Sequence, residues 1–179
     1  MSDEALASGR ASGRAADLLS AGRALLGVPL GISASSGSWF AVAALLILSW
    51  WSDFLDGRLA RRSGGRTKLG DWDLAADTTV GAGLLLGLVV GDHVPMLWGL
   101  AGGVLGAGFV VLRNPAFGML LQAMAYGPAL WFVGHESLPA LALVAVTITV
   151  IAVLDASRLF GSVLPAFFGG ILGRRERPG

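Results

Sequence analysis

Two apolar stretches of the chain meet at a polar junction that reads Ser52-Asp-Phe-Leu-Asp-Gly-Arg-Leu-Ala-Arg61 and then, after a basic loop, Gly70-Asp-Trp-Asp-Leu-Ala-Ala-Asp77. Four of its aspartates form two pairs, Asp53 with Asp56 and Asp73 with Asp77. Residues three or four apart share one face of a helix, so each pair projects from one face of its own helix. Carboxylates at or near bilayer depth are costly and normally face a bundle interior, where they mark a functional site. The junction therefore predicts a site built by two consecutive helices.

The composition excludes an ordinary soluble domain. Hydrophobic residues make up 54% of the chain and charged residues 14%, and the mean hydropathy is +0.70. The 179 residues leave room for about six membrane crossings of roughly 20 residues each. The 27 glycines suit helices that pack closely in a membrane. Because there is no cysteine, thiolate metal sites, thiol nucleophiles and disulfides are excluded.

We expect an all-α fold, an integral membrane bundle of six transmembrane helices in one domain over residues 17–172. Residues 1–16 are expected to form a mobile cytoplasmic tail and residues 173–179 a basic one. The first apolar segment contains Gly27, Pro29 and Gly31, which predicts a kink or a partly interfacial position. The six segments run approximately over Leu18–Ala34, Trp39–Leu59, Leu74–Gly91, Val94–Leu112, Ala116–Val133 and Leu138–Phe160.

The basic residues predict the orientation, because cytoplasmic loops of membrane proteins are enriched in Lys and Arg. With a cytoplasmic N-terminus, the titratable residues of the outer loops are Asp92, His93, His135 and Glu136. Both termini are then cytoplasmic, in a multi-pass protein of the cell membrane with its acidic site at the cytoplasmic face. Every Lys and Arg falls on that inner side: Arg10, Arg14, Arg23, Arg58, Arg61, Arg62, Arg66, Lys68, Arg113, Arg158, Arg174, Arg175 and Arg177.

Two further patterns concern how the helices sit in the membrane and against each other. Three tryptophans fall near outer helix ends, as expected for an interfacial aromatic belt: Trp39, Trp98 and Trp131. Four glycines recur at small-xxx-small spacing, at Gly99, Gly102, Gly103 and Gly106. This spacing predicts a helix-packing face, inside the monomer in preference to a homodimer contact.

The paired aspartates are suited to a hard cation. Mg²⁺ and Mn²⁺ prefer oxygen ligands and are commonly held by a few carboxylates together with substrate phosphate oxygens. An antiparallel hairpin would bring the two pairs face to face, and a divalent cation would relieve their repulsion. The alternative is that each aspartate pairs with one of the nearby cations between Arg58 and Lys68. Gly57 leaves room for a ligand, Gly70 precedes a helix start that favours anions, and Arg61 could grip a phosphate.

The run Asp53-x2-Asp56-Gly57-x2-Ala60-Arg61-x8-Gly70 resembles the signature of the CDP-alcohol phosphatidyltransferases. That signature continues Gly-x3-Asp-x3-Asp, whereas this chain has Gly70-x2-Asp73-x3-Asp77, one residue fewer. A tighter helix start would absorb the missing residue; otherwise its removal turns the pair by about 100°. Upstream, Asp17-Leu-Leu-Ser20-Ala-Gly-Arg23 is similar to the Asn-x-Leu-Ser/Thr-x2-Arg that opens the first helix in many members.

The resemblance implies a transferase of phospholipid biosynthesis. Such enzymes pass the phosphatidyl group of CDP-diacylglycerol to an alcohol and release CMP. Carried over, Asp53, Asp56 and Asp73 would bind one Mg²⁺ or Mn²⁺, while Asp53, Asp73 and Asp77 would bind a second. Asp77 would also be the general base. The CDP-lipid would be contacted at Gly57, Ala60, Arg61, Thr67 and Gly70.

The acceptor alcohol is less constrained. Arg113 and Arg158 are cations outside the motif and could receive the phosphate of glycerol 3-phosphate, although they serve equally as topology determinants. A phosphatidylglycerophosphate synthase is the leading prediction, and a phosphatidylinositol-phosphate type of synthase is the alternative. The expected partners are the lipid bilayer, the CDP-lipid and a small alcohol, with no nucleic acid. A transporter or a catalytically silent protein would be a different class, but a transport path predicts acids near mid-helix, not at one end of one hairpin.

Overall fold

The structure, a computed structural model, describes residues 18–62, 73–156, 161 and 164–165 of the chain. Within these residues every regular element is a helix and no strand occurs, which confirms the predicted all-α class. Residues 18–25 are helical and lead directly into the first labelled helix. The helices are α2 (Gly27–Ser35), α3 (Trp39–Arg62), α4 (Asp73–Val90), α5 (Met96–Leu112), α6 (Pro115–Glu136) and α7 (Leu138–Leu154). The predicted tails, residues 1–16 and 173–179, lie outside the described residues.

The first segment contains one turn residue, Leu26, whose backbone angles are still helical, and its predicted kink stays a prediction. The Leu26 N–H donates to the Arg23 carbonyl, three residues back, at 2.9 Å. Pro29 has no N–H to donate to Leu25, so one bond of the regular helical pattern is missing near this turn residue. Leu18–Ser35 forms a single apolar stretch.

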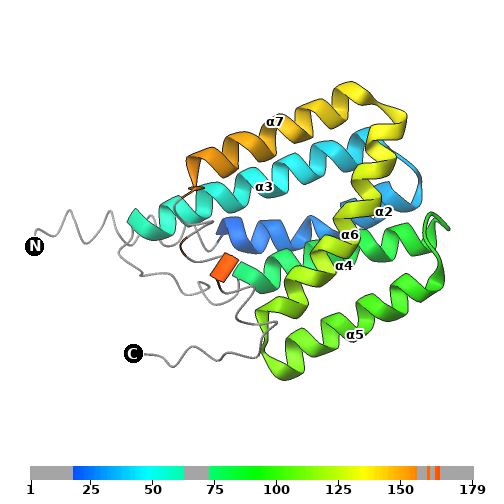
Figure 1. The fold of residues 1–179 in the computed structure, drawn as a ribbon, viewed down its shortest axis with the longest axis horizontal. Helices are drawn as coiled ribbons and strands as arrows, with labels where there is room; N and C mark the ends of the chain where they lie inside the picture. The colour runs from blue at the N-terminus through cyan, green and yellow to red at the C-terminus, as the bar shows by residue number, and fades with distance from the viewer. Residues whose placement is uncertain (1–17, 63–72, 157–160, 162–163, 166–179) are drawn as a thin grey trace, which may run out of the picture.

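Successive helices run in alternating directions (Figure 1). Short connections join α2 to α3, α4 to α5, α5 to α6 and α6 to α7. The C-terminal ends of α3, α5 and α7 therefore lie at the same end of the bundle as the N-terminal ends of α4 and α6 (Figure 1). We call this end the aspartate end, because Asp53, Asp56 and Asp77 belong to it. At the core, α2 packs against α4 and α3, while α6 crosses α4 and also contacts α3, α5 and α7.

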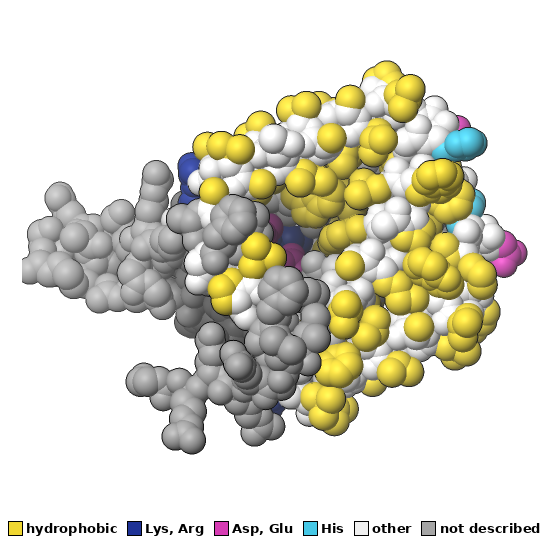
Figure 2. Space-filling model, in the orientation of Figure 1, with side chains coloured by type: hydrophobic (Ala, Val, Ile, Leu, Met, Phe, Trp, Pro, Cys, Tyr) yellow, Lys and Arg dark blue, Asp and Glu magenta, His cyan; other side chains and the backbone are white. Residues whose placement is uncertain are grey.

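The outer surface of the bundle is apolar. Large hydrophobic side chains are exposed on every helix, among them Phe40, Leu86, Val111 and Leu143, and they cover most of the face in Figure 2. Such a surface suits lipid and not water. Three helical stretches are long and apolar enough to cross a membrane, and three shorter ones are also apolar: Leu18–Ser35, Trp39–Arg58 and Pro115–Glu136, then Leu74–Val90, Met96–Leu112 and Leu138–Leu154.

Charged side chains divide between the two ends of the bundle. The Lys and Arg side chains drawn in Figure 2 lie at the aspartate end, and the histidines lie at the opposite end. This division is the one that the predicted topology requires. Which end faces the cytoplasm stays a prediction.

The glycine stripe of α5 packs inside the monomer. Gly99 faces Val89, Gly102 faces Leu85 and Gly106 faces Leu121, so added methyl groups there would contact α4 or α6. At Gly103 an added methyl group would have no heavy atom within 4 Å. Most of the stripe is therefore used by the fold itself.

The aromatic-belt prediction is wrong for Trp39. This residue begins α3 and is 7% exposed, stacked on Phe132 with ring centroids 4.6 Å apart and edge-on to His93 at 4.8 Å. The turn between α2 and α3 places the indole against α6 and away from lipid. Trp131, in contrast, is 72% exposed.

Helices α2 and α4 approach each other through glycines. A methyl group at Gly27 would stand 2.8 Å from the Thr79 carbonyl oxygen, and one at Gly31 would stand 2.7 Å from that of Gly83. Only a residue without a Cβ fits such spacing. The two backbones consequently run side by side, and side chains at their aspartate ends can meet.

Candidate functional site

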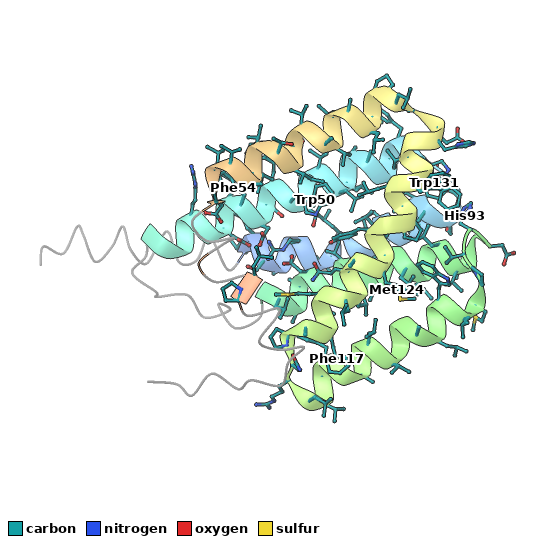
Figure 3. All side chains as sticks on the ribbon, in the orientation of Figure 1. Trp50, Phe54, His93, Phe117, Met124 and Trp131 are labelled. Atoms are coloured by element: carbon teal, nitrogen blue, oxygen red, sulfur yellow. The ribbon has the colours of Figure 1, made fainter. Side chains whose placement is uncertain are left out.

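A single arginine stands at the centre of the aspartate end. The Nη1 atom of Arg23 lies 2.6 Å from Asp53 Oδ1 and 3.3 Å from Asp56 Oδ2. Its Nε atom lies 3.0 Å from Asp77 Oδ1. Three carboxylates from two helices therefore meet at one guanidinium. Asp53 directly precedes Phe54 on α3, which Figure 3 labels. We call these four residues the Arg23 cluster.

Helical spacing brings the members of the cluster together. Asp53 and Asp56 share one face near the end of α3, and Asp77 lies in the second turn of α4. Ser20 lies one turn before Arg23 on the helical segment 18–25. The Ser20 hydroxyl donates to Asp56 Oδ2 at 3.0 Å, which ties this segment to α3 a second time.

Burial within the cluster is graded. The Arg23 side chain is 0% exposed and that of Asp56 is 4% exposed, whereas Asp53 is 32% and Asp77 27% exposed. Arginine stays protonated in proteins, and a buried charge requires an opposite partner. Arg23 and Asp56 thus form the buried part of the cluster, while the partly exposed Asp53 and Asp77 remain accessible to a ligand.

The donor set fits a hard divalent cation. Carboxylate oxygens are the ligands that Mg²⁺ and Mn²⁺ prefer, and three carboxylates contact the same guanidinium here. A carboxylate has two oxygens and about four lone pairs, so one contact with Arg23 does not exhaust it. Within the described side chains, no three acidic or histidine residues are spaced to hold a cation as they stand. In this structure the cluster is arranged around Arg23.

The structure describes the other residues predicted for the site only in part. Asp73 is the first residue of α4, one turn before Asp77; its side chain is outside the description. Gly57 follows Asp56 and is partly buried. Ala60 and Arg61 belong to the last turn of α3, but their side chains also fall outside the description. Three further predicted site residues lie outside the described residues altogether: Thr67, Gly70 and Arg158.

The shortened spacing before Asp73 has not removed Asp77 from the cluster. Asp77 contacts Arg23, which also contacts Asp53 and Asp56. Whether a tighter helix start absorbs the missing residue before Asp73 stays a prediction, because residues 63–72 lie outside the described residues.

Of the cations considered for local pairing with the aspartates, the structure describes the side chain of Arg58. The guanidinium carbon of Arg58 lies 4.3 Å from the ring centre of Phe54, and Arg58 is exposed. Within the described part of the chain, the aspartates find their cation in Arg23 and not in Arg58. Arg113 is an exposed residue that caps α5 with a φ of 49°, and no ion pair joins it to the described aspartates.

Sequence reasoning missed the roles of Arg23 and Ser20. The sequence predicts Arg23 to be a topology determinant and part of a first-helix motif, but it assigns Arg23 no contact with the aspartates. A signal was present, because both residues belong to the run Asp17-Leu-Leu-Ser20-Ala-Gly-Arg23 and lie three apart, on one helix face.

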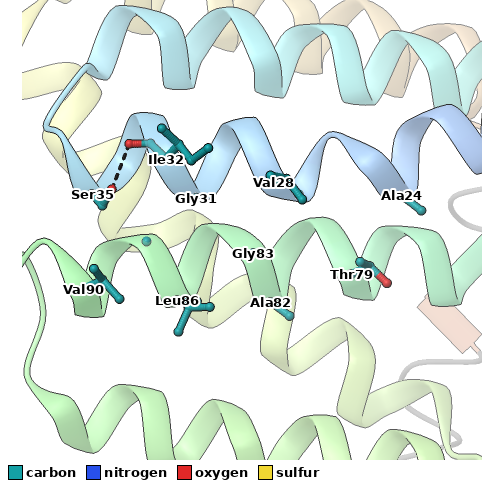
Figure 4. A pocket seen from close by; sticks show the side chains of 12 residues that line it. Ala24, Val28, Gly31, Ile32, Ser35, Thr79, Ala82, Gly83, Leu86 and Val90 are labelled. Carbon is teal, nitrogen blue, oxygen red and sulfur yellow. Dashed lines mark hydrogen bonds between the residues drawn. The ribbon is translucent and has the colours of Figure 1, made fainter.

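An apolar groove adjoins the cluster. It has a volume of about 460 Å³ and runs between α2 and α4 (Figure 4). One end is lined by Ala24 and Thr79, which are one and two residues beyond Arg23 and Asp77 in the sequence. The other end is lined by Ser35 and Val90. The groove therefore leads from the charged cluster along the apolar part of the bundle.

Comparison with known proteins identifies the family. The family model of the CDP-alcohol phosphatidyltransferases matches residues 14–165, which include the whole Arg23 cluster and the signature residues. Neither a curated protein nor a solved structure matches the chain significantly. The match covers most of the chain and coincides with the helical bundle. The chain therefore belongs to the CDP-alcohol phosphatidyltransferase family, whose members are transferases of substituted phosphate groups.

Proposed function

We propose that this enzyme transfers the phosphatidyl group of CDP-diacylglycerol to glycerol 3-phosphate and releases CMP, at the cytoplasmic face of the cell membrane. The observation that carries the proposal is the convergence of Asp53, Asp56 and Asp77 on Arg23 at one end of an apolar bundle. A donor of this kind has a lipid part that needs the bilayer and a nucleotide part that needs water. A charged site where apolar helices end serves both parts.

The signature aspartates have distinct proposed roles. Asp53, Asp56 and Asp73 would hold one Mg²⁺ or Mn²⁺, and Asp53, Asp73 and Asp77 a second. Bound cations of this kind neutralise the diphosphate and the charge that develops on the departing CMP. The partial exposure of Asp53 and Asp77 supports contact with a ligand that arrives from outside the bundle.

Asp77 is the proposed general base. Its Oδ1 atom lies 3.0 Å from Arg23 Nε, and its side chain is partly exposed. It would take the proton from the acceptor hydroxyl while that oxygen attacks the phosphorus that carries the diacylglycerol. The bond from this phosphorus to the bridging oxygen of CMP breaks, and CMP leaves with that oxygen.

The CDP-diacylglycerol would lie across the aspartate end of α3 and α4 and along the groove between α2 and α4. Gly57, Ala60, Arg61, Thr67 and Gly70 would contact the CDP part, as the family signature implies. The groove beside Ala24 and Thr79 supports a place for one acyl chain, because it begins next to the cluster and is lined mainly by apolar groups.

The proposal also names the acceptor alcohol and the residues that would bind it. Arg113 and Arg158 would receive the phosphate of glycerol 3-phosphate, which makes the enzyme a phosphatidylglycerophosphate synthase. The alternative acceptor is an inositol phosphate, which presents the same phosphate group to a cation.

The test is a transferase assay with purified protein in vesicles that contain CDP-diacylglycerol and Mg²⁺ or Mn²⁺. A panel of alcohols is supplied, and the lipid product is identified by mass spectrometry. The proposal expects phosphatidylglycerophosphate from glycerol 3-phosphate. A product from inositol phosphate alone would select the alternative acceptor, and no product from any alcohol would indicate a catalytically silent member or a transporter.

A further inference from the structure

We infer that Gln122 and Tyr126 of α6 form a pair of hydrogen-bond donors for an ester carbonyl of the lipid that supplies the phosphatidyl group. They would make the enzyme bind a lipid with ester-linked chains more tightly than one with ether-linked chains. This inference rests on the proposed function, because the ester belongs to the CDP-diacylglycerol proposed there.

The two side chains share one face of α6. They are four residues apart, so they lie one turn apart on the same side of the helix. Gln122 meets α4 at Gly81, where an added methyl group would stand 3.1 Å from the Gln122 Cγ atom. Tyr126 meets α3 at Trp50, with the ring centroids 5.8 Å apart and the rings at 84° to each other. This face of α6 is therefore directed at the two helices that carry the aspartates.

The positions of these contacts place the pair next to the Arg23 cluster, on its membrane side. Trp50 comes three residues before Asp53 on α3, and Gly81 comes four residues after Asp77 on α4. Each is thus about one helical turn, roughly 5.4 Å, farther from the aspartate end than the aspartate on its own helix face. The charges of three members of the cluster also act on the Tyr126 phenol, which agrees with a short separation.

Both side chains can offer a hydrogen-bond donor to a ligand. The Gln122 Nε2 atom is buried and has no hydrogen-bond partner within the described part of the chain. The Tyr126 phenol is hydrogen-bonded to the Trp50 indole, whose N–H can only donate. That bond uses the phenol oxygen and leaves the phenol O–H available. Because a buried donor without a partner is unfavourable, a ligand atom that accepts from this pair gains affinity.

An ester carbonyl has the chemistry that this pair requires. Its oxygen is neutral and only accepts, and it can take two donors at once. Tyr126 packs against the hydrophobic core, where a neutral acceptor is less costly to bury than a charged one. If the cluster binds the diphosphate, the ester groups follow within a few bonds, toward the apolar part of the bundle. An ether-linked chain has no carbonyl and would leave both donors unpaired.

A lipid can approach the cluster on this side of the bundle. Figure 2 shows acidic and basic side chains at the floor of a hollow between hydrophobic side chains, in the region where α3 and α6 face each other. Figure 3 labels Trp50, the α3 residue that Tyr126 contacts, in the same region.

The test compares the binding of CDP-diacylglycerol and of CDP-dialkylglycerol with the same chain lengths to the purified full-length protein in detergent. Mn²⁺ is present but no alcohol is, so no phosphatidyl transfer takes place. In Gln122→Leu and in Tyr126→Phe the Kd for the diacyl lipid should rise about three- to tenfold, because one hydrogen bond to the carbonyl is lost. The Kd for the dialkyl lipid should stay as in the wild type.

Two features of the design isolate the carbonyl contact. Thr149→Val removes a hydroxyl on α7 that donates to the Ala145 carbonyl of its own helix at 2.8 Å, so this control should bind both lipids like the wild type. Tyr126→Phe keeps the ring and its contact with Trp50, and it carries the test alone if Gln122→Leu does not fold.

Three results would overturn the inference. The first is a diacyl-to-dialkyl ratio of Kd values that is unchanged in the folded variants. The second is an equal loss of affinity for both lipids, which would mean that the pair has only a structural role. The third is unchanged lipid binding with a raised KM for glycerol 3-phosphate, which would mean that the pair binds the acceptor alcohol.

These binding measurements do not use turnover, so they separate from the proposed function. Failure of the transferase assay with the expected ratios of Kd values would refute only the reaction. Normal turnover with an unchanged ratio would refute only the donor pair.

Discussion

The close contact between α2 and α4 makes Gly31→Ala a sharp test of how the site is assembled. A methyl group on Gly31 would stand 2.7 Å from the Gly83 carbonyl oxygen, a backbone atom that cannot rotate away. Overpacking of this kind costs about 1–3 kcal/mol. Replacing a helical glycine by alanine also gains about 1 kcal/mol of helix propensity.

A matched control isolates the overpacking. Gly103 is also helical, and a methyl group there has no heavy atom within 4 Å, so Gly103→Ala should gain the propensity alone. Gly31→Ala should therefore be less stable than Gly103→Ala by about 1–3 kcal/mol.

Equilibrium unfolding of both variants in the same detergent measures this difference. Because Arg23 lies on the helical segment that leads into α2, and Asp77 lies on α4, Gly31→Ala should also lower CMP release per folded molecule, while Gly103→Ala should not. Equal stability and equal activity of the two variants would refute the close packing of α2 on α4.

Three further changes test separate parts of the account. Ser20→Ala removes the donor to buried Asp56 and should cost about 1–3 kcal/mol of unfolding free energy, measured by denaturation; an unchanged stability would show that this hydrogen bond is absent. Ala82→Trp fills the groove and should raise the KM for CDP-diacylglycerol. The control Ala101→Trp, on the exposed side of α5, should leave this KM unchanged. Equal KM values for the two variants would show that the acyl chain does not bind in the groove. Arg113→Gln should raise the KM for glycerol 3-phosphate, and an unchanged KM would exclude Arg113 from the acceptor site.

The helices and the acidic hairpin could be predicted because their signals are local. Apolar runs of membrane length and the i,i+3 or i,i+4 spacing of the aspartates are readable without tertiary contacts. The all-α class followed from these signals, and the family assignment followed from the resemblance of the spacing to a known signature. The glycine stripe of α5 was also informative, since small residues at this spacing allow close helix packing.

The centre of the cluster could not be predicted in the same way. Arg23 lies thirty residues from Asp53 in the sequence. The enrichment of basic residues on the cytoplasmic side of membrane proteins already explains a cation near a helix end. Its burial depends on how the segment 18–25 packs between α3 and α4, which periodicity does not reveal. Trp39 was misread for a similar reason, because a tryptophan at a helix end suits either the interface or the core, and its stacking on Phe132 decides between them.

The measurement that tests the central claim most directly is CMP release from CDP-diacylglycerol by the wild type and by Asp77→Asn. Both are assayed with glycerol 3-phosphate and Mn²⁺, and with EDTA as a control. We predict release by the wild type that stops in EDTA, and a loss of about 10²-fold or more in Asp77→Asn, because a general base typically contributes that much. Full activity of a folded Asp77→Asn variant, or release that continues undiminished in EDTA, would contradict the account.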